Sequence, residues 1–287
     1  MANSRIIVWD VGHGSSVSIL APNGRTGMLD LGANTETEFS PIKFTKSMWR
    51  LDRLNHLTIS HPHIDHIRDI LNLRLLELDT LNALEIPKEQ LFAERIQEKD
   101  RDLLNAYVQL KQRFSGPITA LKDPNNPSWG GQGYFSHYSI KADWQSEPNN
   151  ASIVTFYRSG KFTLLYPGDI ESRGWNELLK SKEFVNDLKS TAFFIASHHG
   201  REAGFSKEIV ETAAPQLVIV SDSWFKDTSV TDRYSHLATG FEVINDNTGT
   251  KEKRSVVSTR ADGRVIIDVS DLGNKTTANV RVKKTLS

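Results

Sequence analysis

One short stretch, residues 60–66, holds three histidines and one aspartate: His61, His63, Asp65 and His66. It directly follows the apolar run Leu57–Ile59. Imidazole nitrogens and carboxylate oxygens are the ligands that suit zinc, manganese and iron in proteins. Packing of a core does not require so many imidazoles so close together. The stretch therefore predicts a metal site, and the alternative is a loop that carries surface histidines.

The spacing within this stretch has a geometric meaning. Residues two apart in an extended segment point to the same side, so His61 and His63 can bind one ion. Pro62 favours that conformation, because the residue before a proline is pushed out of the helical region. If a helix begins at Asp65, then Asp65 and His66 turn toward a second ion beside the first. One loop would then supply ligands to two metals.

Composition limits the classes of protein that this chain can belong to. Its 287 residues allow one large domain or two small ones, and 38% hydrophobic with 24% charged residues is typical of a globular enzyme. The net charge is zero, so contact with nucleic acid would need a local patch. The absence of cysteine excludes disulfides, thiolate ligands and cysteine nucleophiles. Because the chain lacks a membrane-spanning apolar run and a signal-peptide core, we expect a cytoplasmic protein without membrane partners.

Strand patterns occur in both halves of the chain. Predicted strands cover residues 5–9, 16–20, 26–31, 152–157, 161–166, 192–196, 217–220, 255–260 and 264–269. The last two are predicted to form a hairpin, and helical patterns cover residues 171–188 and 207–213. Strands in both halves, with helices after them, indicate an α/β sandwich of two sheets.

The region after the histidine stretch has a different texture. Residues 70–81 are leucine-rich, and residues 88–114 have apolar spacings that predict one long helix. We expect residues 67 to about 115 to form a helical insertion that partly caps the site. Residues 115–150 read as loop and short strand rather than a linker, so we expect a single domain over residues 1–287. Trp129, Tyr134 and Trp144 of that region either wall a substrate groove or fill the core.

Further polar residues follow predicted strand ends, where sites commonly gather. Asp169 comes after Pro167-Gly168 and is placed to bridge two cations, or else to serve as a turn residue or helix cap. His198 and His199 follow a buried strand, which favours metal ligation over a histidine satisfied within the core. His13 stands between two loop glycines and is either a site residue or a surface residue.

Taken together, these motifs resemble the metallo-β-lactamase superfamily of binuclear metal hydrolases, whose His-x-His-x-Asp-His signature falls on residues 61–66. In particular the chain is similar to the hydrolase domain of ComEC-type DNA-uptake competence proteins and their stand-alone relatives. The family's Asp-Val-Gly-Gln-Gly-Asp, Ile-Asp-Thr-Gly, Pro-His-His-Gly-Ser and Tyr-Gly-His-Pro segments correspond to residues 10–15, 29–32, 197–201 and 234–237. The resemblance implies a four-layer αββα sandwich of two mixed β-sheets with a helical insertion after the first metal motif.

The resemblance also implies a set of metal ligands for two divalent cations, which we expect to be Zn²⁺, with Mn²⁺ as the alternative. The ligands are His61 and His63 for one ion, Asp65, His66 and His198 for the other, Asp169 as the bridge, and His199 as the alternative to His198. Many relatives carry a further histidine on the first ion. Asn149 occupies that region here, so the first ion would be held more weakly.

Other roles follow from the same resemblance. Asp30 would orient a ligand histidine. Asp65 and His236 would be catalytic, with His236 binding a phosphate oxygen or protonating the leaving oxygen. His13 and Tyr234 would contact the substrate.

The expected chemistry is hydrolysis by a hydroxide held between two cations. The leading hypothesis is a phosphodiesterase, in particular a nuclease, with a nucleic acid or nucleotide as substrate. The first alternative is a hydrolase of a small substrate, such as a cyclic nucleotide, a choline-phosphate ester or a lactone. The second is a binding or regulatory module that keeps the fold around a degraded site. The sequence leaves protein partners and oligomeric state open.

Overall fold

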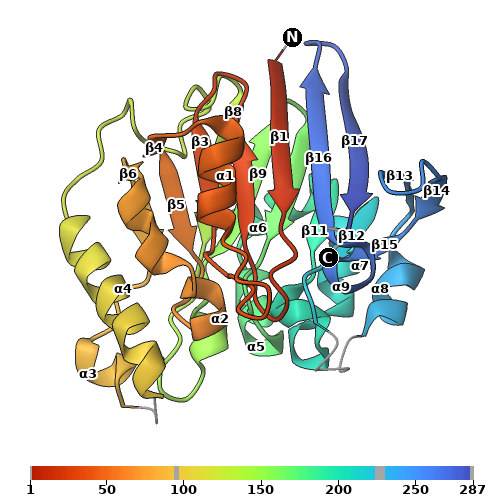
Figure 1. Ribbon diagram of the computed structural model, residues 1–287. Coiled ribbons are helices and arrows are strands. Elements are labelled where there is room, and N and C mark those ends of the chain that lie inside the picture. Colours follow the sequence, from red (N-terminus) through yellow and green to blue (C-terminus); the bar gives the residue numbers. More distant parts are fainter. Residues whose placement is uncertain (1, 94–96, 224–229, 285–287) are drawn as a thin grey trace.

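The computed structural model describes residues 2–93, 97–223 and 230–284. Two β-sheets pack face to face, and helices cover both outer faces (Figure 1). The expected four-layer α/β sandwich of two mixed sheets is thereby confirmed. In the part of the chain that the structure describes, no helix combines the length and the apolar character needed to cross a membrane.

Nine described strands form the first sheet, in the order β14-β13-β17-β16-β1-β2-β3-β5-β7. In chain order these strands are β1 (Ala2–Val8), β2 (Val17–Leu20), β3 (Thr26–Leu29), β5 (His56–Ile59), β7 (Leu81–Ala83), β13 (Phe241–Asn245), β14 (Lys251–Arg254), β16 (Arg264–Asp271) and β17 (Thr276–Lys283). A short pair, β4 (Arg53–Leu54) and β6 (Glu77–Leu78), stands apart from it.

Six described strands form the second sheet, in the order β15-β12-β11-β10-β9-β8. They are β8 (Gly133–Tyr138), β9 (Val154–Ser159), β10 (Phe162–Tyr166), β11 (Phe193–Ile195), β12 (Leu217–Val220) and β15 (Val256–Ser258). Strands β10, β11, β12 and β15 run parallel to one another, whereas β9 is antiparallel to both of its neighbours, β10 and β8.

The main core lies between the two sheets, and the alternation of side chains along the strands produces it. In β1, Ile6 and Val8 join this core, while Ile7 points to the other face and packs with Trp9. From the second sheet, strands β10, β11 and β12 contribute buried aromatic and branched residues to the same core. The sheets are thus held together by apolar side chains that sequence periodicity assigns to one face.

Separate apolar clusters attach the helices to the outer faces. On the first sheet lie α1 (Pro41–Trp49), α2 (Ile64–Ile67), the 3₁₀ helix η1 (Ile70–Leu75), α3 (Lys88–Leu91) and α4 (Arg101–Arg113). On the second lie α5 (Ser172–Leu178), α6 (Lys182–Lys189), α7 (Lys207–Ala213) and α8 (Thr231–Leu237). The remaining short turns are η2 (Glu98–Asp100), η3 (Pro148–Ala151), η4 (Ser197–Gly200), η5 (Glu202–Gly204) and α9 (Thr259–Asp262).

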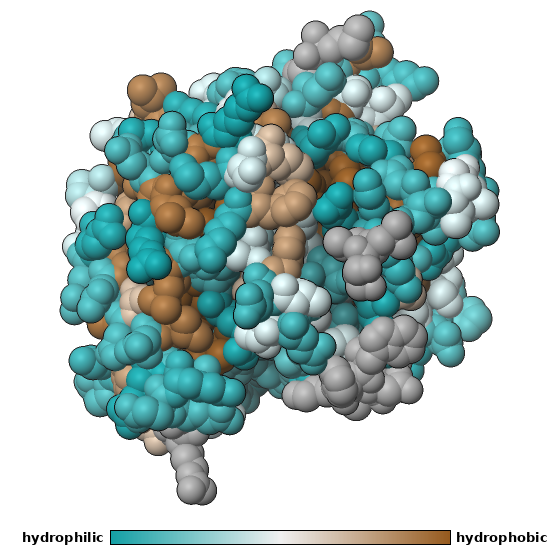
Figure 2. Space-filling model, in the orientation of Figure 1, coloured by the Kyte–Doolittle hydropathy of each residue, from teal (hydrophilic) through white to brown (hydrophobic). Residues whose placement is uncertain are grey.

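The surface is mostly hydrophilic on the face seen in Figure 2, with apolar patches on the side of α1 and α4. Some exposed apolar side chains belong to α1, namely Phe44 and Met48, and others to η1, namely Leu71 and Leu75. A helix that faces solvent usually carries polar residues on that side, so the exposed aromatic ring on α1 stands out.

Strand direction brings the polar loops to one edge of the sandwich. Because β2 is antiparallel to both β1 and β3, and β5 is parallel to β3, strands β1, β3 and β5 all end at the same edge. The parallel strands β10, β11, β12 and β15 also end together in the second sheet. The loops after these strands meet at the lower edge in Figure 1.

Several element predictions are wrong in detail. Residues 255–260 and 264–269 do not form a hairpin: β15 pairs with β12 in the second sheet, whereas β16 pairs with β1 and β17 in the first. The helix predicted over 171–188 is broken into α5 and α6, because the Ser181 side chain accepts a hydrogen bond from the Phe184 amide and caps a new helix.

The predicted insertion after the histidine stretch also differs from expectation. Residues 70–81 form η1 and then β6, and Leu81 starts β7, which pairs with β5. The long helix predicted over 88–114 is represented by α3, η2 and α4, and residues 94–96 lie outside the described part. The apolar spacing identified most of the buried face of α4, since Leu103, Leu104 and Tyr107 are buried; Leu110 is buried as well.

Candidate metal centre

The histidine stretch adopts the local shape that its spacing predicts. It follows β5 directly, and His63 is still extended (φ −65°, ψ 149°) when α2 begins at Ile64. Asp65 and His66 therefore lie in the first helical turn, while His61 and His63 precede it. The imidazole pair of the extended part is close, with His61 Nε2 3.0 Å from His63 Nδ1.

Four side chains from three loops form a compact cluster: Asp65, His66, Asp169 and His199. One nitrogen or oxygen from each lies within 4.8 Å of the others. His66 Nε2 is 3.2 Å from Asp169 Oδ1, and His199 Nε2 is 3.3 Å from Asp65 Oδ2 and 3.5 Å from Asp169 Oδ2. Imidazoles and carboxylates that converge in this way form a donor set for a divalent cation.

Asp169 occupies the position between the two groups of histidines. Its Oδ1 faces His66, and its Oδ2 lies 3.5 Å from His199 and 3.9 Å from His61 Nε2. The loop that carries it comes very close to the histidine stretch: a Cβ on Gly168 (φ +60°) would lie 2.7 Å from the Ser60 Cβ. Glycine is therefore required there for both conformation and space.

The second histidine loop has unusual backbone geometry. His198 (φ 50°, ψ 47°) and His199 (φ 56°, ψ 29°) are both left-handed, which is uncommon for residues other than glycine. His199 Nδ1 lies 3.0 Å from the carbonyl oxygen of Ser221. Because a carbonyl only accepts, Nδ1 carries the proton, and Nε2 faces the carboxylates.

Asp30 holds the other imidazole of the cluster. It is fully buried and accepts hydrogen bonds from His66 Nδ1 (2.5 Å) and from the Ser60 amide (2.6 Å) and hydroxyl (2.5 Å). The Tyr166 hydroxyl donates to it as well. This network fixes the His66 ring so that Nε2 points at Asp169.

The buried nitrogens of the cluster provide a test of whether the residues fit a metal. Among the described residues, His66 Nε2 and His199 Nε2 are buried and have no partner with hydrogen-bond geometry, although carboxylate oxygens lie 3.2–3.5 Å away. A buried polar atom normally has a partner. A cation coordinated by these nitrogens and carboxylate oxygens would satisfy all of them. The residues therefore fit a metal ion.

The electrostatics of the cluster point the same way. Burial alone would lower the pKa of His66, but Asp169, Asp30 and Asp65 outweigh it and raise the pKa well above its usual value. For His199 the same balance of burial against Asp169 and Asp65 raises the pKa to about 9. The pKa values of Asp65 and Asp169 are lowered by these imidazoles despite the cost of burial. The two buried carboxylates are stabilised by positive charge beside them, and a divalent cation would supply that charge.

The predicted ligand on the second loop is His198, with His199 as the alternative; the structure groups His199 with the cluster instead. His198 Nε2 is 3.9 Å from Asp169 Oδ2, but its Nδ1 lies 3.2 Å from Glu171 Oε1. Asn149 donates to the same Glu171 oxygen over 2.9 Å. Asn149 therefore meets the site through Glu171, at the edge of the cluster.

His13, for which the sequence leaves a site role and a surface role open, lies at the mouth of the site. Its Nε2 is 3.3 Å from Asp65 Oδ2 and 3.2 Å from an Arg201 Nη atom, and its ring centroid is 4.8 Å from that of His199. The other Nη atom of Arg201 lies 3.2 Å from His198 Nε2. Arg201 thus spans the rim of the site, between the loop that carries His13 and the loop that carries His198 and His199.

The two residues predicted from the last motif, Tyr234 and His236, both belong to α8. Tyr234 is fully buried, and its ring packs against Phe194 and Phe205 at 6.0 and 5.1 Å, so the predicted contact with substrate is replaced by a role in the core. Its helical spacing matches a buried face as well as a motif. His236 is exposed on α8, and its catalytic role stays a prediction.

Three further residues shape the site: two are given no role there from sequence, and the third, Trp144, is expected either to wall a substrate groove or to fill the core. Glu171 and Ser221 contact the two histidines of the second loop, and Trp144 lies 5.4 Å from the His63 ring. The backbone oxygen of Ser221 leaves no sequence signal, whereas Glu171 is marked only by following Asp169 at a helix start. Trp144 is buried beside the site, and Trp129 lies in the main core.

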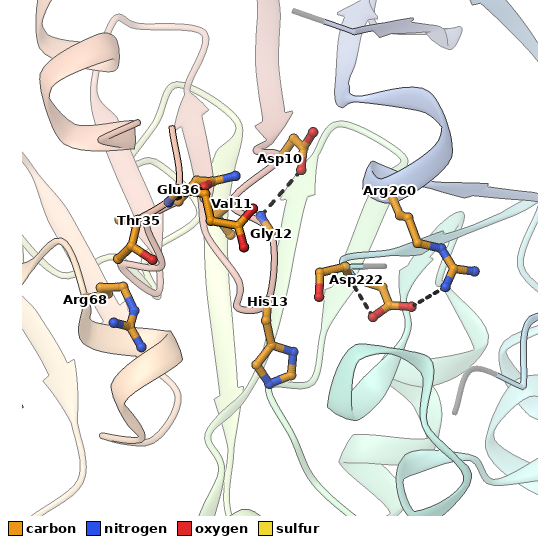
Figure 3. A pocket seen from close by; sticks show the side chains of 12 residues that line it. Asp10, Val11, Gly12, His13, Thr35, Glu36, Arg68, Asp222 and Arg260 are labelled. Atoms are coloured by element: carbon orange, nitrogen blue, oxygen red, sulfur yellow. Dashed lines mark hydrogen bonds and ion pairs between the residues drawn. The ribbon is translucent and has the colours of Figure 1, made fainter. Parts of the chain in front are cut away.

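A cavity of about 320 Å³ opens beside His13. Figure 3 shows that Arg68 and Arg260 lie on either side of the loop that carries His13, and that Asp222 faces Arg260. The Arg260 Nη1 to Asp222 Oδ2 distance is 3.6 Å. The centre therefore opens into a polar space with guanidinium groups on two sides.

Two packed mixed sheets with outer helices, and a histidine–aspartate cluster on the loops at one edge, are the arrangement that the resemblance to the metallo-β-lactamase superfamily implies. The cluster has a donor set that could hold a divalent cation. The predicted resemblance to ComEC-type proteins is confirmed as a similarity: the chain is 24% identical over 231 residues to ComE operon protein 3 of Bacillus subtilis (strain 168). That match covers 74% of this chain but 27% of the relative, so the chain spans about a quarter of its length. No protein-family model matches the chain.

Solved structures of low sequence identity are also similar. A diphosphatase from the PhnP family is 12% identical, with 93% of this chain and 98% of that chain covered at a TM-score of 0.45. A putative metal-dependent hydrolase from Parabacteroides distasonis ATCC 8503 is 13% identical, with 88% and 91% covered at 0.47. The metallo-β-lactamase superfamily protein ST1585 from Sulfolobus tokodaii is 13% identical, with 76% and 79% covered at 0.39.

Proposed function

We propose that this protein is a metal-dependent phosphodiesterase whose substrate is a nucleic acid. The observation that carries the proposal is the position of Asp169, whose carboxylate lies between the His66–His199 group and His61. One carboxylate between two groups of imidazoles provides two neighbouring cation positions. Pairs of cations of this kind serve in phosphatases and nucleases.

The ligands for these positions are assigned by proximity. His61 and His63 would hold the first ion, and Asp65, His66 and His199 the second, with Asp169 shared. When bound, two cations would lower the pKa of water and offset negative charge that develops on phosphate oxygens. Zn²⁺ suits the imidazole-rich donor set, and Mn²⁺ is the alternative.

The chain's own residues contribute orientation and charge. Asp30 and the Ser221 carbonyl each fix the tautomer of one imidazole, so that both Nε2 atoms face Asp169. Arg201 places a permanent positive charge on the rim, beside His13 and His198. A guanidinium matches the oxygens of a phosphodiester in shape and charge, so we assign Arg201 to substrate binding. His13 lies beside Arg201 and Asp65 and would position the substrate.

The resemblance to ComEC-type DNA-uptake proteins supports nucleic acid as the substrate class. The competing small-substrate hypothesis is supported by the 320 Å³ cavity at the mouth, which matches the lower end of ligand pockets in size. The hypothesis of a degraded site is disfavoured by the convergence of all four cluster residues.

A panel of substrates tests the proposal. The protein would be stripped of metal, reloaded with Zn²⁺ or Mn²⁺, and incubated with single- and double-stranded DNA and RNA, a cyclic nucleotide, a choline-phosphate ester and a lactone. We expect metal-dependent cleavage of a polynucleotide. Asp169→Asn should abolish it, whereas Asp143→Asn, at an exposed turn, should not. Hydrolysis of only the small compounds would favour the alternative, and loss of every activity would contradict both.

A further inference from the structure

Two adjacent cavities, called the groove below, lie beside the mouth of the metal centre. The 320 Å³ cavity beside His13 is followed by a second cavity of about 720 Å³. Asp10, Asn34 and Arg260 line both cavities, so the two share a wall. The second cavity lies over α1, the end of β1 and the start of β16, and it falls within the size range of ligand pockets.

The wall of the second cavity is aromatic. Trp9, Phe39 and Phe44 form a cluster with ring centroids 5.2–5.7 Å apart. Trp9 is buried and backs the cluster, Phe39 is half-buried, and Phe44 is 37% exposed. In the space-filling view the surface between α1 and β16 carries an apolar strip with hydrophilic residues on both sides (Figure 2). Planar apolar surface therefore faces solvent inside a polar groove.

Basic residues surround these rings. Lys43, Arg264 and Lys284 line the second cavity together with Arg260, against the acidic Asp10 and Glu38. The Arg264 guanidinium carbon lies 5.4 Å above the Phe44 ring centroid. Burial lowers the pKa of Arg264, and the nearby Asp246 and Arg281 act on it in opposite directions. Among the residues that line the second cavity, four are basic and two are acidic. The chain as a whole has no net charge, so this positive excess is local.

We propose that this groove binds single-stranded nucleic acid, with bases against Phe44 and Phe39 and backbone phosphates against Arg264 and Lys43. The inference rests on the proposed function, since the groove would deliver a phosphodiester to His13 and the metal centre. Aromatic faces combined with cations along a groove are the usual means of holding single strands. Bases in a duplex are stacked on one another and offer no free face, so the aromatic wall favours a single strand.

Fluorescence anisotropy tests the proposal on the full-length protein as purified. The probe is a fluorescein-labelled oligothymidine of about 12 nucleotides with phosphorothioate linkages, which resist cleavage; a duplex of the same length is the comparison. We expect the single strand to bind more tightly. Phe44→Ala should weaken its binding at least about fivefold. Arg264→Gln should also weaken it and reduce the dependence of affinity on salt by about one phosphate contact.

Two further variants show whether weaker binding comes from the loss of a contact with the nucleic acid or from a disturbed fold. Phe44→Leu keeps an apolar side chain but removes the planar ring, and we expect it to bind as weakly as Phe44→Ala. Lys43→Gln changes only an exposed charge on α1 and should reduce the salt dependence in the same way as Arg264→Gln. As matched controls, Leu121→Ala and Lys182→Gln alter exposed residues outside the groove and should leave binding unchanged.

The outcomes distinguish this inference from the proposed function. If the groove variants bind the single strand as tightly as the wild type, or the duplex binds equally well, the groove assignment is overturned even if the protein cleaves nucleic acid. If binding depends on Phe44 and Arg264 but no polynucleotide is cleaved, the nuclease proposal fails and the groove remains a site for single strands.

Discussion

Two pairs of histidines in the interior of this protein have pKa values shifted in opposite directions; His66, His199 and His56 are buried, and His137 is partly buried. His66 and His199 in the metal centre have raised pKa values. His56 and His137, which lie in different sheets with ring centroids 5.6 Å apart, have lowered pKa values, with that of His137 at about 4. In both pairs burial disfavours the charged imidazole. The sign of the shift is therefore set by what surrounds the rings.

The surroundings of the second pair are hydroxyl and aromatic groups. Thr80 already donates its hydroxyl proton to the Asn55 carbonyl, so it accepts from His56 Nδ1. His56 Nε2 then accepts from Thr58 over 2.9 Å, which satisfies a neutral ring on both sides. His137 contacts the Thr155 hydroxyl at 3.0 Å and stacks on Phe135. These partners favour a neutral imidazole that serves packing.

Within the metal centre, a buried position alone does not decide whether the pKa of a histidine is raised or lowered. His61 is fully buried in the centre, yet burial and the neighbouring His66 and His63 lower its pKa well below the usual value. The raised pKa values belong to His66 and His199, which face Asp169 or Asp65 at 3.2–3.5 Å. A single carboxylate at the edge of the centre is not enough, because burial still lowers the pKa of His198 although Glu171 Oε1 lies 3.2 Å from its Nδ1. The carboxylates, rather than the histidines, thus distinguish a cation site from a buried core histidine.

Replacing Asp169 should have the largest effect on the contrast between the raised histidine pKa values in the metal centre and the lowered ones in the core. In Asp169→Asn, we expect the pKa of His199 to fall because its main carboxylate neighbour is lost. We also expect hydrolytic activity to drop by about 10³-fold, since both cation positions lose a ligand. Histidine titration by NMR and metal analysis of the purified variant measure these effects. Retention of two metal ions by the variant would show that Asp169 is not the bridge.

The two histidines of the second loop provide the next comparison. We expect His199→Ala to lower activity by about 10²-fold and to reduce metal content, because Nε2 of His199 faces both carboxylates. His198→Ala should cost about tenfold or less, since its nearer partner is Glu171. Activity and bound metal per chain would be compared at equal protein concentration. The opposite ranking would assign the second ion to His198 and make the present grouping incorrect.

Asp30 tests whether orientation of a ligand matters as much as the ligand. Asp30→Asn keeps the size of the side chain but removes the charge that faces His66. We expect metal affinity to fall by about 10–100-fold. A chelator competition assay measures this, with Asp143→Asn as a matched control at an exposed turn. Unchanged affinity in Asp30→Asn would mean that the Ser60 and Tyr166 contacts hold the loop without help from this charge.

Much of the metal centre could be predicted from sequence because its densest part is local. The extended-then-helical shape of residues 61–66 follows from Pro62 and the start of α2, so the spacing alone places these side chains. The choice between His198 and His199 could not be made, because it depends on two consecutive left-handed residues and on a backbone carbonyl of Ser221. Neither the left-handed backbone nor the carbonyl contact can be predicted from the fact that both residues are histidines.

In the fold, too, features set by local sequence could be predicted, whereas features set by contacts distant in sequence could not. Strand β12 (Leu217–Val220) and helix α7 (Lys207–Ala213) have the bounds that the sequence predicts, because periodicity defines them. The segments around Gly263 read as a hairpin, but their partners are β12 and β1, which lie far away in sequence. Sheet membership depends on those distant partners, as does the contrast between a cation site and a packed histidine pair.

The smallest expected effect concerns the histidine pair in the core. An imidazole whose pKa is 6.5 when unfolded and about 4 when folded contributes stability above pH 6.5 and loses it as the pH falls toward 4. Between pH 7.5 and pH 5 this loss amounts to about 1–2 kcal/mol for His137. His137→Phe, which does not titrate, should show a correspondingly smaller loss of unfolding free energy over that range. Urea denaturation at the two pH values measures it, and the slope rather than the absolute stability is compared, because the Thr155 hydroxyl loses its partner in the variant. An equal loss in both proteins would mean that His137 already titrates normally in the folded state, and the contrast between the two buried pairs would then rest on His56 alone.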